Sequence, residues 1–91
     1  MFELHQYVSV TLIVNRTYNL ITRKEELTRQ VKVIGIEDGY WLKKPQNIYH
    51  VLCEEYPFSI KVSEATLKKG CVIDLTGKVA KVLNDETGIK Q

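Results

Sequence analysis

Apolar residues at every second position constrain this chain more than any other feature. In residues 6–14 one row holds Val8, Val10, Leu12 and Val14, and residues 58–62 repeat the alternation. A spacing of two places side chains on one face of a β-strand and does not suit a helix. Val, Ile, Thr and the aromatic residues make up 33 of the 91 residues, whereas Ala occurs twice. The pattern predicts a mainly β protein.

Turn signals divide the chain into short strands. We expect strands at residues 6–14, 28–36, 40–43, 48–53, 58–62 and 71–83. The Asp38-Gly39 pair predicts a hairpin turn, and Gly35 predicts a bulge or a tight bend. Residues 44–47 are expected to form another turn. Residues 15–26 are polar and predict a turn and a long loop, or a wide hairpin connection, and a short helix over residues 22–27 is a further alternative.

One helix is expected over residues 63–70. Ser63 can cap its amino end and Gly70 can adopt the left-handed conformation that ends a helix. The order of elements predicts a small barrel of five to six strands, with one short helix before the last strand. At about 100–200 residues per domain, residues 1–91 form a single domain. Residues 84–91 are polar, and we expect this tail to fray.

Cysteine content and hydropathy bear on the compartment. Cys53 and Cys71 have no second pair beside them and no Cys-x-x-Cys spacing, unlike the cysteines of small secreted domains. The first residues have no basic region before an apolar run, and no stretch is long and apolar enough to span a membrane. We therefore expect a cytoplasmic protein that does not bind membranes.

No arrangement of reactive side chains predicts catalysis. His5 and His50 lie far apart and neither has the spacing of a metal ligand. Adjacent acids such as Glu54 and Glu55 point apart on a strand, so they do not converge for acid–base chemistry. We expect no enzyme activity, no catalytic residue, no metal and no cofactor.

Basic and aromatic residues point instead to nucleic acid. The net charge is only +2, but residues 15–32 hold five basic residues against two acids. Single-stranded DNA or RNA is held by exposed aromatic rings and by a basic groove along the phosphates. The expected phosphate contacts are Arg16, Arg23, Arg29, Lys32, Lys43 and Lys44. The expected stacking residues are Tyr40, Trp41 and Tyr49.

Part of the chain resembles a known family. Residues 67–79, LKKGCVIDLTGKV, resemble the helix end and fourth strand of OB-fold single-stranded-DNA-binding proteins, where Lys-Gly closes the helix and an alternating strand reaches a Gly. Residues 55–62 are similar to the small dimeric single-stranded-DNA-binding proteins of filamentous phages, and together the resemblances cover residues 54–79. It implies a five-stranded barrel, a homodimer and a DNA groove lined by aromatic and basic side chains. The family needs another strand after Gly77, whereas only a few polar residues follow Leu83 here.

Two alternatives stay open at this stage. Residues 35–41 are similar to the bent hairpin of Sm-like barrels, so the barrel is expected to be OB-like or Sm-like. The small size and an apolar first strand also fit a protein-interaction module, such as a phage or mobile-element regulator that inhibits or modulates a host protein.

Overall fold

The structure is a computed structural model that describes residues 1–41 and 44–84, and only the backbone of residues 40, 41 and 44. Its strands are β1 (Tyr7–Tyr18), β2 (Ile21–Trp41), β3 (Lys44–Cys53), β4 (Phe58–Ser63), β5 (Val72–Asp74) and β6 (Lys81–Val82). The one helix among these residues, α1 (Glu64–Lys69), lies between β4 and β5 in the chain.

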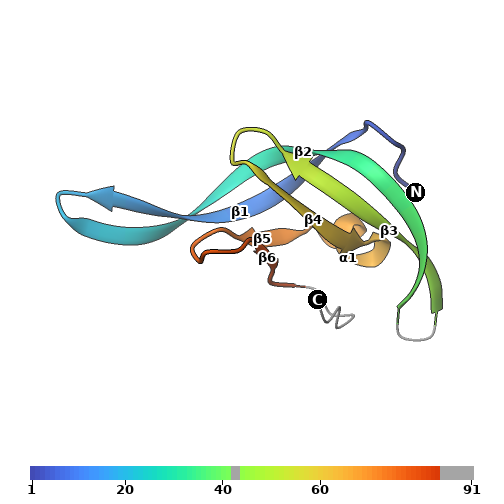
Figure 1. The fold of residues 1–91 in the computed structure, drawn as a ribbon. Helices are drawn as coiled ribbons and strands as arrows, with labels where there is room; N and C mark the ends of the chain where they lie inside the picture. Colours follow the sequence, from blue (N-terminus) through green and yellow to red (C-terminus); the bar gives the residue numbers. More distant parts are fainter. Residues whose placement is uncertain (42–43, 85–91) are drawn as a thin grey trace.

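The six strands form one sheet that curls into a nearly closed barrel (Figure 1). Their order is β4-β3-β2-β1-β5-β6. The first four strands form an antiparallel meander, and β5 then returns parallel to β1. The predicted fold class, a small and mainly β barrel with one short helix, is confirmed. The helix precedes the last two strands instead of the last one.

The core is filled by the inward rows of the strands. Val10, Leu12 and Val14 of β1 are buried, while Tyr7 and Ser9 between or beside them are exposed, as the alternation predicts. The other buried apolar residues are Val31, Val33, Tyr49, Val51, Cys53, Val62, Leu67, Cys71 and Ile73. The two cysteines form no disulfide and act as small core residues.

The bend of β2 closes the barrel. At about 3.3 Å per residue its 21 residues would span roughly 66 Å if straight. The whole molecule is only 48 Å along its longest axis, so the strand curves strongly. The register of β2 against β3 shifts between Val33 and Gly35, which confirms the bulge predicted at Gly35.

Helix α1 lies where the capping residues Ser63 and Gly70 predict it. The side chain of Ser63 accepts a hydrogen bond from the backbone N–H of Thr66, with a nitrogen–oxygen distance of 3.3 Å. Gly70 ends the helix at φ 105°, a value that favours glycine. Leu67 is buried on the inner face of the helix. Because Leu67 belongs to the core, α1 packs on the barrel beside β3 and β4.

The predicted turn at Asp38-Gly39 is wrong. Asp38 pairs with Asn47 and Gly39 pairs with Gln46, so β2 continues to Trp41 and the predicted turn at residues 44–47 is part of β3. Gly39 serves close packing instead, because a Cβ at this position would overlap the side chain of Ile48.

The predicted strand over residues 71–83 is also wrong, because it is split into β5 and β6. The carboxylate of Asp74 accepts hydrogen bonds from the backbone N–H and the hydroxyl of Thr76, at 2.8 and 2.6 Å. Such a local bond competes with strand pairing and turns the chain. The chain then folds back, so that Ile73 pairs with Val82.

Candidate nucleic-acid interface

Residues 15–24, called the arm below, extend β1 and β2 beyond the barrel as a two-stranded ribbon (Figure 1). The predicted long loop and the alternative helix over this region are wrong, whereas the alternative of a hairpin connection agrees with the antiparallel pairing of β1 and β2. The strands pair through Tyr18 and Ile21, and the turn residues Asn19 and Leu20 both have positive φ, 46° and 69°. No residue of the arm belongs to the hydrophobic core or packs against it as a partly buried apolar residue. The arm is therefore held by its own strand pairing.

The arm brings two of the predicted site residues together. Arg16 and Arg23 are direct cross-strand partners, so their side chains leave the same face of the ribbon. Tyr18 lies on that face too, and its hydroxyl accepts a hydrogen bond from the Nη1 of Arg16 at 3.3 Å. Glu25 at the base of the arm pairs with the Nε of Arg16 at 3.0 Å. These contacts with Tyr18 and then Glu25 raise the pKa of Arg16, which stays cationic.

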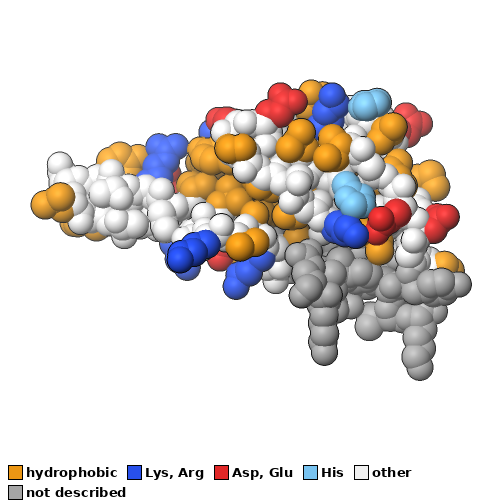
Figure 2. Space-filling model, in the orientation of Figure 1, with side chains coloured by type: hydrophobic (Ala, Val, Ile, Leu, Met, Phe, Trp, Pro, Cys, Tyr) orange, Lys and Arg blue, Asp and Glu red, His pale blue; other side chains and the backbone are white. Residues whose placement is uncertain are grey.

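The far end of the arm is apolar. Figure 2 shows hydrophobic side chains at its tip and cationic side chains farther back toward the barrel. Leu20 is 98% exposed, and Tyr18 and Ile21 are each 56% exposed. Between residues 15 and 24 the arm carries Arg16, Arg23 and Lys24 and no acid. It combines exposed ring and aliphatic surface with a local charge of +3.

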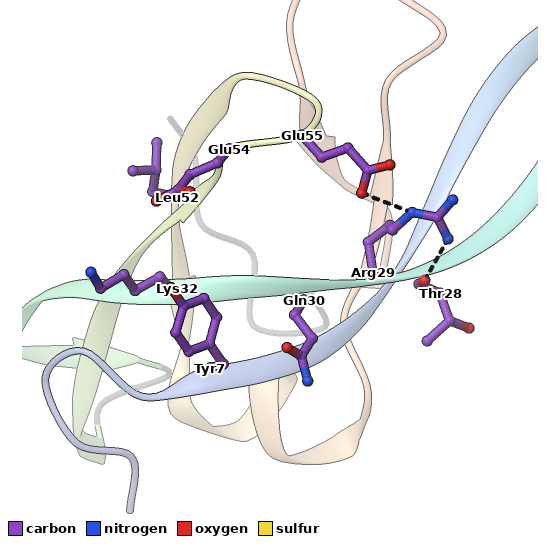
Figure 3. A pocket seen from close by; sticks show the side chains of 8 residues that line it. All are labelled: Tyr7, Thr28, Arg29, Gln30, Lys32, Leu52, Glu54 and Glu55. Carbon is purple, nitrogen blue, oxygen red and sulfur yellow. Dashed lines mark hydrogen bonds and ion pairs between the residues drawn. The ribbon is translucent and has the colours of Figure 1, made fainter.

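A second pairing of a cation with an aromatic ring lies at the other end of β1. Lys32 is the direct strand partner of Tyr7, and its Nζ lies 6.0 Å from the centre of the Tyr7 ring. Tyr7 is 54% exposed. This pair therefore offers a stacking face and a charge at the rim of a pocket of about 370 Å³ (Figure 3).

The rest of that pocket is less suited to phosphate. The Nε of Arg29 pairs with Glu55 at 3.0 Å, and its Nη1 donates to the carbonyl of Thr28 at 2.8 Å (Figure 3). Glu54 also lines the pocket. Arg29 and Lys32, predicted as members of one groove, both line this pocket. Alternation along β2 directs their side chains to opposite faces of the strand, so Arg29 pairs with Glu55 whereas Lys32 lies beside the Tyr7 ring.

The remaining predicted residues divide into two groups. Lys43 lies outside the described residues, and so do the side chains of Tyr40, Trp41 and Lys44, although the backbone pairs Trp41 with Lys44. The backbones of Tyr40 and Trp41 are at the end of β2 opposite to the arm. The binding role of all these residues stays a prediction.

Tyr49 is not a stacking residue, contrary to the prediction. Its side chain is fully buried in the core, so its ring offers no face to a base. Its hydroxyl donates to Glu64 Oε1 at 3.1 Å and accepts from the backbone N–H of Phe2 at 3.1 Å. The ring of Phe2 packs edge-on against it, with the ring centres 5.4 Å apart. Tyr49 joins the amino-terminal segment to α1 and is structural.

Sequence reasoning missed Tyr7, Tyr18 and Leu20. The signal for the last two was available, because Asn19 is a residue that tolerates positive φ and stands between the strand-forming pairs Thr17-Tyr18 and Ile21-Thr22. Because no Gly follows Asn19, the hairpin signal is weaker than that of Asp38-Gly39. Because of this unusual turn, the sequence did not predict that residues 15–24 form two paired strands.

One further polar cluster lies on the outer face of the sheet. Glu37 of β2 contacts the Nε2 of His50 at 3.1 Å and the Nζ of Lys61 at 3.4 Å. The hydrogen bond from His50, followed by that from Lys61, lowers the pKa of Glu37. Within residues 1–41 and 44–84 no three His, Cys, Asp or Glu side chains are grouped as metal ligands. The cluster is an ion-pair link between three strands.

Comparison of the chain with protein-family models, curated proteins and solved structures found no match. In the described part of the chain, no helix has the length and apolar character needed to cross a membrane.

Proposed function

We propose that this protein binds single-stranded DNA or RNA without catalysis, and that the arm is its main contact. The observation that carries the proposal is the same-face grouping of Arg16, Arg23 and Tyr18 on a ribbon that packs on nothing else in the core. Arg forks onto phosphate and stacks on bases, and an exposed Tyr ring supplies a stacking platform. Residues 15–24 contain no acid, and Glu25, which borders them, pairs with the Nε of Arg16 at 3.0 Å, so a phosphate must compete with Glu25 for Arg16 but not for a second acid within the arm.

The Tyr7–Lys32 pair supplies a second contact of the same kind at the base of β1. It lies on the opposite row of the ribbon from Arg16, so a bound strand would cross the ribbon to reach both. Arg29 contributes through its ion pair with Glu55, which positions the β3–β4 turn beside this contact. We further propose a cytoplasmic location, supported by two buried cysteines that form no disulfide. A homodimer would present two arms to one strand.

A specific observation favours a second candidate function. The apolar tip formed by Tyr18, Leu20 and Ile21 could bind a protein partner, because such exposed apolar surface is typical of interaction sites. The protein would then act as an interaction module, such as a phage or mobile-element regulator of a host protein. In that case the arginines would tune the rate of association instead of holding a phosphate backbone.

Anisotropy of a labelled oligonucleotide tests the proposal. We expect binding at micromolar protein that weakens steeply with salt, because each phosphate contact on a single strand contributes a slope of about −0.7 in log K against log salt. Arg16→Ala and Arg23→Ala should each lower that slope by about this amount. Lys68→Ala, which removes an exposed cation of α1, is the matched control and should change little.

Two outcomes decide against the proposal. The first is no binding at low salt, in which case retention of one stoichiometric host protein after nuclease treatment would favour the interaction module. The second is binding whose salt slope is the same in the double variant Arg16→Ala/Arg23→Ala as in the wild-type protein, which would remove the arm from the interface.

A further inference from the structure

The turn at the tip of the arm contains a residue that does not favour the backbone conformation it adopts there. A two-residue hairpin turn with two positive φ values prefers Asn followed by Gly. Asn19 fits the first position, but Leu20 occupies the second at φ 69°. A branched, bulky residue is strained there, because its Cβ crowds the backbone. Backbone strain of this kind gathers at sites that serve a function.

The same residue is also almost fully exposed, at 98%. It is flanked by two further apolar side chains, Tyr18 and Ile21, that are each 56% exposed. Neither folding nor the core explains an aliphatic side chain at this position, because the arm does not pack on the core. The tip therefore carries strain and exposed apolar surface together at the most projecting point of the molecule (Figure 1).

The charges behind the tip indicate what it meets. Arg16 and Arg23 are partners across the two strands. They form the next pair on the same face after Tyr18 and Ile21, and Lys24 follows on the other face. An apolar tip with cations behind it fits a ligand whose apolar faces lie beside anions. Single-stranded nucleic acid has this construction, because its stacked bases follow one line of phosphates, and proteins insert Leu or Ile between neighbouring bases.

We infer that Leu20 is a wedge that enters the stack between two neighbouring bases while Arg16 and Arg23 hold the flanking phosphates. The inference rests on the proposed function and names its ligand more closely. Because insertion must first separate two bases, the arm favours single strands and mismatched sites over fully paired duplex. Tyr18 and Ile21 then cover the opened faces of the bases.

Fluorescence of 2-aminopurine placed within a single-stranded oligonucleotide tests the wedge, because this base brightens when its neighbours unstack. We expect the wild-type protein to raise the emission severalfold at saturation. Leu20→Ala should remove most of that rise and bind about tenfold more weakly, in line with the loss of about one base contact. Leu4→Ala, which shortens a half-exposed Leu outside the arm, is the control and should behave as wild type.

Leu20→Gly separates the wedge from folding. Glycine relieves the positive φ, so this variant folds at least as well as the wild-type protein, yet it should also lose the rise in emission. A full rise in either Leu20 variant would overturn the wedge while leaving the proposed function intact. Failure of the wild-type protein to bind any oligonucleotide would overturn both. Binding of phosphatidylglycerol vesicles that depends on Leu20, without any rise in 2-aminopurine emission, would overturn the wedge in favour of a lipid surface.

Discussion

At the scale of single residues, tyrosine has two opposite roles in this molecule. Tyr49 is fully buried and hydrogen-bonded, whereas Tyr7 and Tyr18 are 54% and 56% exposed beside cations. All three stand in strands, so residue type alone does not separate them. A shift of one residue turns every side chain of a strand to the other face. The inward row of β3 could not be assigned from sequence because the preceding turn was placed at residues 38–39.

Tyr49→Phe tests the structural role of this hydroxyl. Its removal leaves Glu64 Oε1 without its donor and the N–H of Phe2 without its acceptor, so we expect a loss of about 1–2 kcal/mol in the free energy of unfolding. Urea denaturation followed by circular dichroism measures the loss. Tyr7→Phe is the control, because its ring is exposed, and should stay within about 0.5 kcal/mol of wild type. Equal stabilities for the two variants would contradict the assignment, as would a loss of oligonucleotide binding by folded Tyr49→Phe.

At the scale of elements, local signals succeeded where no distant contact competes with them. Ser63 and Gly70 cap α1 as predicted, and Gly35 marks the bulge in β2. The pair Asp38-Gly39 carries an equally strong local signal, yet it lies inside a ribbon. The side chain of Ile48, nine residues away along the chain, packs into the space that the missing Cβ of Gly39 leaves. That contact depends on strand pairing and cannot be inferred from the pair itself.

The outer face of the sheet gives a prediction about pH. Glu37 links β2 to His50 of β3 and to Lys61 of β4, and hydrogen bonds from these residues lower the pKa of Glu37 below its ordinary value of 4.5. A group whose pKa is lower in the folded than in the unfolded state stabilises the fold. This contribution is complete at pH values above the ordinary pKa and is lost as the pH falls through the folded-state pKa.

We therefore expect Glu37→Gln to unfold at a slightly lower urea concentration than wild type at neutral pH. The difference should be small, because all three side chains are partly exposed, and it should shrink as pH falls below 4.5. Urea midpoints of the two proteins across this range measure the effect. A midpoint difference that grows in acid would show that Glu37 has the opposite linkage.

At the scale of the whole molecule, strand pairing redistributes the basic residues that appear as one patch in the sequence. The hairpin places Arg16 directly opposite Arg23, although seven positions separate them. Arg29 and Lys32 are closer in sequence but leave opposite faces of β2. The local charge was therefore predictable from composition, whereas the grouping depends on a turn that lacks the usual Gly. Sequence reasoning could find a basic region but not the arm that organises it.

The division of the molecule into a barrel and an arm leads to a prediction about a shortened protein without the arm. Because no residue of the arm joins the core, residues 16–23 can be replaced by Asn-Gly without loss of core contacts. The new turn would be closed by the existing pair of Asn15 with Lys24, and Asn-Gly suits a two-residue hairpin. We expect the shortened protein to keep its free energy of unfolding within about 1 kcal/mol of wild type.

Oligonucleotide binding should respond differently, because the shortened protein lacks Arg16, Tyr18, Leu20 and Arg23 together. We expect its affinity to fall by at least the combined effect of the double arginine variant and Leu20→Ala, with a weak residual contact through Tyr7 and Lys32. Anisotropy on the folded protein measures this loss. If the barrel alone bound with wild-type affinity, the interface would lie elsewhere, and the end of β2 opposite to the arm would be the next surface to mutate. If the barrel failed to fold, the arm would be part of the folding unit, which its lack of core contacts argues against.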